Sequence, residues 1–155
     1  MENRLERTLV LIKPDGVQRN LVGSIITRLE QRGLKLIGAK FVQVSNELAC
    51  EHYKVHIGKP FYDGLIQYIT KSPVMAMVWE GPNVIKAVRQ TMGATNPLQA
   101  EPGTVRHDYG LMTGRNLTHA SDSPETAQNE ISLWFKPEEL TTWIHENEDW
   151  LTGDN

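Results

Sequence analysis

Residues 8–16 have the sequence TLVLIKPDG, and the fold can be built outward from them. The first five are apolar or β-branched, which is typical of a buried strand, and the Pro14-Asp15-Gly16 that follows is a strong turn signal. We therefore predict a strand over residues 8–12 that ends in a tight loop. Lys13, between strand and turn, would then present its ammonium at the edge of a sheet.

Helical and strand-like patterns alternate after this strand. Apolar residues at helical spacing over 21–29 predict a helix, with Asn20 as its N-cap and Gly33 just past its end. Further along, we expect a strand over 34–44, helices over 47–55 and 61–69, a strand over 74–79 and a helix over 84–92.

The last third of the chain begins with a long irregular segment. Residues 94–114 show no sustained periodicity, and a loop of about 20 residues in a compact domain tends to be functional. Residues 116–119 could then pair as a short strand, and Ser123 caps a final helix whose first position is Pro124. This order predicts one α+β domain over residues 1–155, a sandwich with a mostly antiparallel sheet.

Charge is unevenly distributed in this chain, whose net charge is −3. Residues 81–121 carry four basic and two acidic side chains, whereas residues 122–155 carry one basic and nine acidic ones. A locally positive segment in an acidic protein suits a small anionic ligand better than a nucleic acid duplex. There is no run of 18 apolar residues and no signal-peptide pattern, so we expect a cytoplasmic protein without a membrane span.

Several common catalytic motifs are missing. The chain lacks the phosphate-binding patterns GxxxxGK[ST] and GxGxxG, and also CxxC, HExxH and GxSxG. A phosphate would therefore have to be bound by separate side chains. His52 and His56 are four apart and could begin a zinc site on a helix, but no third ligand accompanies them. We take them to be surface histidines and expect no metal site made by the protein.

His119 has more informative neighbours. It lies in GRNLTHASDS, residues 114–123, directly before the helix that Ser123 caps, and such helix N-termini favour anions. Glu130 can face His119 if the chain folds tightly between them. A carboxylate bonded to one ring nitrogen fixes the tautomer and leaves the other nitrogen free as a nucleophile. The segment therefore favours a catalytic histidine over a purely structural one.

Phosphoryl transfer needs positive charge around the transferred group. Four residues could supply it: Lys13, Arg89, Arg106 and Arg115. Each of them alone is more often a solvated surface charge. Their convergence on one histidine would point to phosphate chemistry, but it cannot be derived from their spacing.

Three segments together resemble the nucleoside diphosphate kinase family. They are IKPDGV at residues 12–17, the NP at 96–97 followed by PGTVR at 102–106, and NLTHASDS at 116–123. The resemblance runs in register from about residue 7 to about residue 140, and its last motif, NxxHxSD, is highly specific to that family.

The resemblance implies a ferredoxin-like α/β sandwich with a mostly antiparallel four-stranded sheet covered by helices. It also implies a ping-pong exchange of the γ-phosphate between nucleoside triphosphates and diphosphates. By position, His119 is the phosphorylated nucleophile, Glu130 orients it, Ser121 bonds near Glu130, and Tyr53 lies close to the histidine. The implied nucleotide contacts are Lys13, Arg89, Thr95 and Arg106 to the phosphates, Asn116 to a sugar hydroxyl, and Phe61 and Leu65 to the base.

The family also implies Mg²⁺ held mainly by the nucleotide, ATP and other nucleoside di- and triphosphates as partners, and a homo-oligomer, with a hexamer favoured over a tetramer. His107 departs from the family pattern, which has a small residue there. One alternative is a non-catalytic nucleotide-binding module of the same fold, which could lose His119 or Glu130 freely. Direct nucleic-acid binding is a further alternative, but the acidic tail and the lack of a dense basic stripe speak against a dedicated site.

Overall fold

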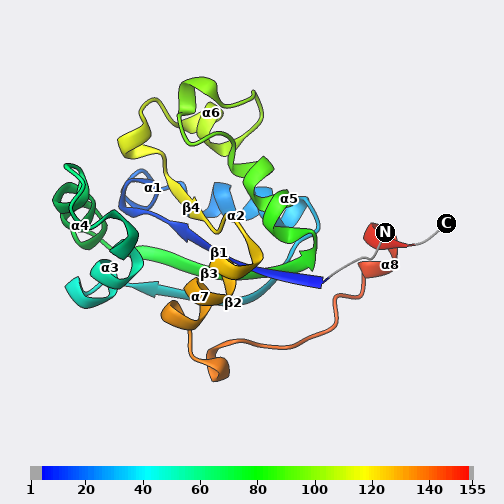
Figure 1. The fold of residues 1–155 in the computed structure, drawn as a ribbon. Coiled ribbons are helices and arrows are strands. Elements are labelled where there is room, and N and C mark those ends of the chain that lie inside the picture. The colour runs from blue at the N-terminus through cyan, green and yellow to red at the C-terminus, as the bar shows by residue number, and fades with distance from the viewer. Residues whose placement is uncertain (1–4, 154–155) are drawn as a thin grey trace.

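The computed structural model describes residues 5–153 and has an antiparallel sheet at its centre (Figure 1). Its strands are β1 (Leu5–Ile12), β2 (Lys35–Val42), β3 (Val74–Pro82) and β4 (Thr118–Ala120), in the order β2-β3-β1-β4. All three neighbouring pairs are antiparallel, with β1 in the middle between β3 and β4. The expected α+β sandwich with a four-stranded sheet is confirmed.

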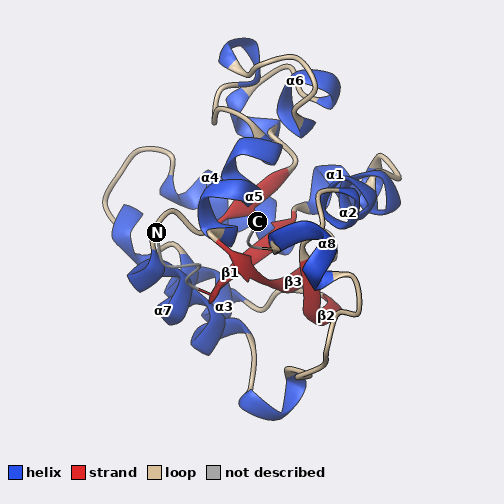
Figure 2. Cartoon of the chain, turned by 90° about the vertical axis from the view of Figure 1, so that its right-hand side faces the viewer, coloured by secondary structure: helices blue, strands red, loops and turns tan. Residues whose placement is uncertain are grey.

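Both faces of this sheet are covered by helices. Successive side chains of β1 point to opposite faces, so alternate residues of the strand are buried in two different apolar clusters. Val10 and Ile12 enter one apolar cluster, and Leu9 and Leu11 enter the other. Helices α2 (Val22–Gln31) and α5 (Val84–Met92) cover the first face. Helices α3 (Asn46–His52), α4 (Tyr62–Thr70) and the end of α7 (Pro124–Trp134) cover the second. Figure 2 shows α3 and α7 on the side of the sheet opposite α2. A continuous apolar run in β1 follows directly from this double burial.

Three expectations about local structure were wrong. The predicted loop after β1 is a short helix, α1 (Pro14–Gln18), because Pro14 occupies its first position and the N–H of Val17 donates to the carbonyl of Lys13. Asn20 does not cap α2; it has a left-handed φ of 59°, and Leu21 is the N-cap. The irregular segment 94–114 contains α6 (Val105–Tyr109), which Thr104 caps through its side chain.

The remaining elements are short. They are the 3-10 turns η1 (Lys54–His56), η2 (Pro97–Gln99), η3 (Thr113–Arg115) and η4 (Pro137–Glu139), and the helix α8 (Glu148–Thr152). Within residues 5–153, no helix is both long and apolar enough to cross a bilayer.

The chain around His119 is held firmly on both sides. His119 is the central residue of β4 and pairs with Leu11 of β1. Four residues later, the Ser123 hydroxyl accepts the N–H of Thr126 at 3.1 Å and starts α7, as the sequence predicted. The sharp turn between β4 and α7 brings the first two turns of the helix back over the sheet.

Candidate active site

His119 is hydrogen-bonded to the carboxylate that the sequence paired with it. Its Nε2 lies 2.8 Å from Oε2 of Glu130, and the Ser121 hydroxyl donates to Oε1 of the same carboxylate at 2.6 Å. Ser121 is fully buried and also accepts the N–H of Leu9 at 3.3 Å. Both carboxylate oxygens of Glu130 are thus fixed, and the imidazole ring is fixed with them.

The surroundings of Glu130 stabilise the negative charge of its carboxylate. Burial alone would raise the pKa of Glu130, but the hydrogen bonds from His119 and Ser121 outweigh it and lower that pKa. An ionised Glu130 accepts the Nε2 proton of His119, so that Nδ1 of His119 carries the free lone pair.

Two arginines donate hydrogen bonds to the backbone carbonyls on either side of His119 in β4. The Arg106 guanidinium donates to the carbonyls of Thr118 at 2.7 Å, Asn116 at 3.2 Å and Gly93 at 2.9 Å. Arg89 donates to the carbonyl of Ala120 at 3.1 Å. The two carbonyls next to His119 in the chain therefore each receive an arginine, so two of the four candidate cations, Arg89 and Arg106, lie next to His119.

Arg106 is the more buried of the two, with 7% of its surface exposed. Burial, together with the neighbouring Arg89, lowers its pKa to about 10, so it remains a cation at neutral pH. Three of its five N–H donors are used by backbone carbonyls, which leaves two for a ligand.

Lys13 joins the same region from the end of β1. Its ammonium donates to Oδ1 of Asn116, whose amide nitrogen donates to the carbonyl of Thr95 at 2.9 Å. Burial, together with the cations of Arg106 and Arg115, lowers the pKa of Lys13 to about 8, although the carboxylate of Asp15 opposes this shift. This lysine therefore changes charge close to the physiological range.

His52 was expected on the surface, and this expectation was wrong. Its side chain is 2% exposed, and its ring meets that of His119 edge-on, with centroids 4.7 Å apart. The indole N–H of Trp134 donates to its Nδ1 at 3.1 Å, and burial first, then the neighbouring His119, lowers its pKa to about 3. Helical spacing from the buried Ala49 would have turned His52 inward, and this signal was available in the sequence.

Tyr53 lies one ring further out. It is buried, and its ring centroid is 4.7 Å from that of His52, so His52 lies between it and His119 in this chain of contacts. Burial, with the negative charge of Glu130, raises the pKa of its phenol to about 12, so the Tyr53 hydroxyl stays protonated at neutral pH.

Among the described residues, His52, His119 and Glu130 form the one group of three whose ligand atoms could hold a metal ion. The lone pair of His52 Nδ1 already accepts the indole N–H of Trp134, and Oε2 of Glu130 already bonds the His119 ring. Two imidazoles and one carboxylate are also a poor match for Mg²⁺, which prefers oxygen ligands.

Three predicted residues are not tied to this cluster. Phe61 is 51% exposed near the start of α4 and contacts the ring of His56 at 5.3 Å, while Leu65 packs on the second apolar cluster. Arg115 lies over the ring of Tyr68, 4.3 Å from its centroid. Within residues 5–153, no hydrogen bond or ion pair joins Phe61, Leu65 or Arg115 to His119.

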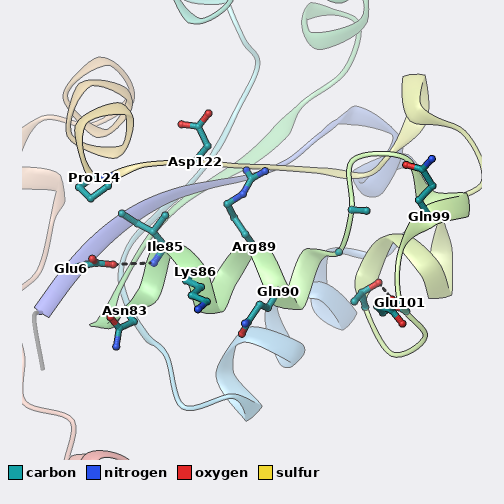
Figure 3. A pocket seen from close by; sticks show the side chains of 13 residues that line it. Glu6, Asn83, Ile85, Lys86, Arg89, Gln90, Gln99, Glu101, Asp122 and Pro124 are labelled. Atoms are coloured by element: carbon teal, nitrogen blue, oxygen red, sulfur yellow. Dashed lines mark hydrogen bonds between the residues drawn. The ribbon is translucent and has the colours of Figure 1, made fainter. Parts of the chain in front are cut away.

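A pocket of about 860 Å³ lies beside the cluster rather than on it. Arg89 extends into it from α5, and Asp122 borders it from the segment after β4 (Figure 3). His119, Lys13 and Arg106 do not line it. Arg89 is thus the residue that the pocket shares with the hydrogen-bonded cluster around His119.

A histidine fixed by a carboxylate, with arginines on the carbonyls at both sides and a lysine nearby, can attack an electrophile and hold an anion at once. Carried on an antiparallel α+β sandwich, it defines a group-transfer enzyme that works on anionic substrates.

Comparison with known proteins narrows this class to one family. The family model described as nucleoside diphosphate kinase matches residues 6–140. The nucleoside diphosphate kinases of Synechococcus sp. (strain JA-3-3Ab) and Staphylococcus carnosus are each 58% identical over 147 residues; the match covers 95% of this chain and 99% and 98% of theirs. A solved nucleoside diphosphate kinase from Halobacterium salinarum, in complex with CDP, superposes with a TM-score of 0.93 at 51% identity, covering 96% of this chain and 99% of that one. The chain belongs to the nucleoside diphosphate kinase family, a family of phosphotransferases.

Proposed function

We propose that this nucleoside diphosphate kinase carries the phosphoryl group on Nδ1 of His119. The lone pair of Nδ1 attacks the γ-phosphorus of a nucleoside triphosphate, and the bond from that phosphorus to the β-phosphate oxygen breaks. The nucleoside diphosphate leaves. A second diphosphate then attacks with a β-phosphate oxygen, the N–P bond breaks and the imidazole is restored. The contact that carries the proposal is the one between Nε2 of His119 and Glu130, 2.8 Å long, because it leaves Nδ1 as the nucleophile.

Glu130 stabilises the positive charge that develops on the ring when Nδ1 attacks. Arg106 and Arg89 would hold the transferred group beside His119, and Lys13 would add a third charge.

We further propose that Thr95 contacts the phosphates and that Asn116 contacts a sugar hydroxyl. Phe61 and Leu65 would contact the base, and Tyr53 would lie near the histidine. The exposed ring of Phe61 supports stacking, which tolerates different bases. A non-catalytic binding module is not favoured, since His119 and Glu130 are both present and bonded to each other.

We propose that Mg²⁺ accompanies the substrate and is held by nucleotide phosphates. The three residues able to approach a metal here are mainly nitrogen donors, which supports a cation carried by phosphate oxygens instead. When bound, the ion would neutralise negative charge on the nucleotide phosphates.

We also propose that residues 1–155 form a single domain and that the protein is cytoplasmic. We further propose that it forms a homo-oligomer, and we favour a hexamer over a tetramer. Both apolar clusters share one sheet, which supports a single domain over the described residues. Leu98, Leu111 and Met112 are each more than 70% exposed on the segment 94–114, which supports a subunit interface there.

The direct test is a phosphoenzyme trap. Incubation with ATP labelled at the γ-phosphate should attach label to the protein in a form that is stable to base and labile to acid, as expected for a phosphoramidate. Addition of a different nucleoside diphosphate should remove the label and yield the labelled triphosphate. Turnover without any labelled protein, measured by rapid quench, would exclude the covalent route.

Activity should also fall in mildly alkaline solution. Because the pKa of Lys13 is lowered to about 8, the free enzyme loses this charge as the pH rises through 8, and kcat/KM should decline there. A bound phosphate favours the ammonium, so kcat at saturation should decline only at higher pH. The control is Lys13→Arg, which stays charged: its kcat/KM should be lower but flat from pH 7.5 to 9.5. The same decline in both proteins would show that Lys13 is not the titrating group.

A further inference from the structure

Asp15, in α1, ties two distant segments together. One of its carboxylate oxygens accepts the hydroxyl of Tyr68 from α4, and the other accepts the backbone N–H of Leu117 at 3.0 Å. The carbonyl of Leu117 in turn accepts the N–H of Lys13 at 2.8 Å. Both polar groups of the Leu117 backbone are therefore bonded to the segment that begins at Lys13.

Leu117 needs this support. Its φ is 75°, in the left-handed region, which is a costly conformation for a bulky residue that is not glycine. Its side chain is fully buried in the first apolar cluster, so the backbone cannot relax without removing that side chain from the core. The turn at Leu117 sets the directions of the residues on either side of it.

The residues on either side of this turn bond the side chains that we propose bind the phosphates of the nucleotide, and one of them, Asn116, is proposed to contact the sugar. Asn116 comes just before it and bonds Lys13 through its side chain and Arg106 through its carbonyl. Thr118 comes just after it, and its carbonyl receives Arg106 next to His119. A small rotation at Leu117 would move all of these groups together.

We propose that Asp15 is a positioning residue that holds the left-handed turn at Leu117, and thereby orients Asn116 toward the sugar of the nucleotide and Lys13 toward its phosphates. This inference rests on the function proposed above for Asn116 and Lys13. Asp15 acts through Leu117 and Lys13 and has no role in the covalent step.

The negative charge of Asp15 has a second effect, on Lys13. The groups that face the Lys13 ammonium are Asp15 from α1, the Tyr68 ring at 5.6 Å, Arg106, Arg115, Asn116 and the neutral His52. Asp15 is the one carboxylate that offsets burial and the two arginines at Lys13. Without this carboxylate, Lys13 would lose its proton at a lower pH.

The test compares three variants on two substrates, a ribonucleoside triphosphate and its 2′,3′-dideoxy analogue. Asp15→Ala removes the acceptor for Leu117, so the preference for the ribonucleotide, as a ratio of kcat/KM values, should fall by about tenfold or more, which corresponds to one sugar hydrogen bond. Asp15→Asn keeps an acceptor and should retain most of the preference. Tyr68→Phe, the matched control, removes only the other partner of Asp15 and should leave the ratio unchanged.

The pH profile gives a second measurement that does not depend on Asp15→Ala being folded. Asp15→Asn should move the alkaline decline of kcat/KM to lower pH, whereas Tyr68→Phe should not. Equal losses on both substrates in Asp15→Ala, or an unmoved profile in Asp15→Asn, would overturn the inference and leave Asp15 with a structural role. If the wild-type protein formed no phosphoenzyme, the proposed function itself would fail, and the trap detects that separately.

Discussion

Replacing His119 with alanine is expected to abolish phosphoenzyme formation and to lower kcat by at least about 10⁴-fold, the scale of removing a covalent nucleophile. The fold should survive, because His119 is 27% exposed and the neighbouring residues of β4 pair with β1 through their backbone. The measurement is rapid-quench labelling with γ-labelled ATP, together with the thermal midpoint of each protein.

His107→Ala is the matched control for this experiment, since His107 is an exposed histidine on α6 whose ring bonds Asp108 and whose backbone N–H donates to Thr104. It should label at the wild-type rate. His52 does not replace His119 as the nucleophile, because its Nδ1 already accepts the indole N–H of Trp134. Label recovered on any residue other than His119 in the wild-type protein would contradict the assignment.

Replacing Arg106 with alanine is expected to lower kcat/KM by about 10²–10³-fold, which is typical when a preorganised donor to a developing anion is lost. It should also reduce the free energy of unfolding by about 2–5 kcal/mol, because three backbone carbonyls at a largely buried position lose their donor. Both effects should appear together, in steady-state kinetics and in denaturant unfolding.

The informative partner variant is Arg106→Lys. Lysine keeps the charge but cannot reach three carbonyls and a phosphate at the same time, so most of the loss of kcat/KM should persist. Full activity in Arg106→Lys would show that charge alone is required, and that the fork of hydrogen bonds to Thr118, Asn116 and Gly93 has no part in catalysis.

Much of the fold was accessible from the sequence. The apolar run of β1, the periodicity of α2 and α5, and the Ser123-Pro124 start of α7 each predicted an element that the structure contains. Elements stabilised by long-range contacts were missed. Helix α6 has five residues, too few for a clear period, and it is anchored by the ion pair of Arg28 with Asp108 at 2.7 Å.

In the active site, too, the features with a local sequence pattern could be predicted, and those that depend on long-range contacts were missed. The segment around His119 indicated a nucleophile, and the resemblance to the family indicated its partners. The burial of His52 could have been predicted from its helical spacing to Ala49, but its hydrogen bond with Trp134, 82 positions away, could not. The bridge made by Asp15 went unrecognised for the same reason, since it depends on Tyr68, 53 positions away. Hydrogen-bond partners at such separations leave no periodic pattern in the sequence.

By itself, the sequence determined which residues could do chemistry and which segments must be buried, since both follow from side-chain type and local spacing. Only the tertiary structure decided that Arg89 and Arg106 meet the carbonyls beside His119, and that Glu130 turns its carboxylate toward Nε2. The physical reason is that directed hydrogen bonds depend on the relative placement of β4, α5, α6 and α7, and that placement is fixed by packing on both faces of the sheet.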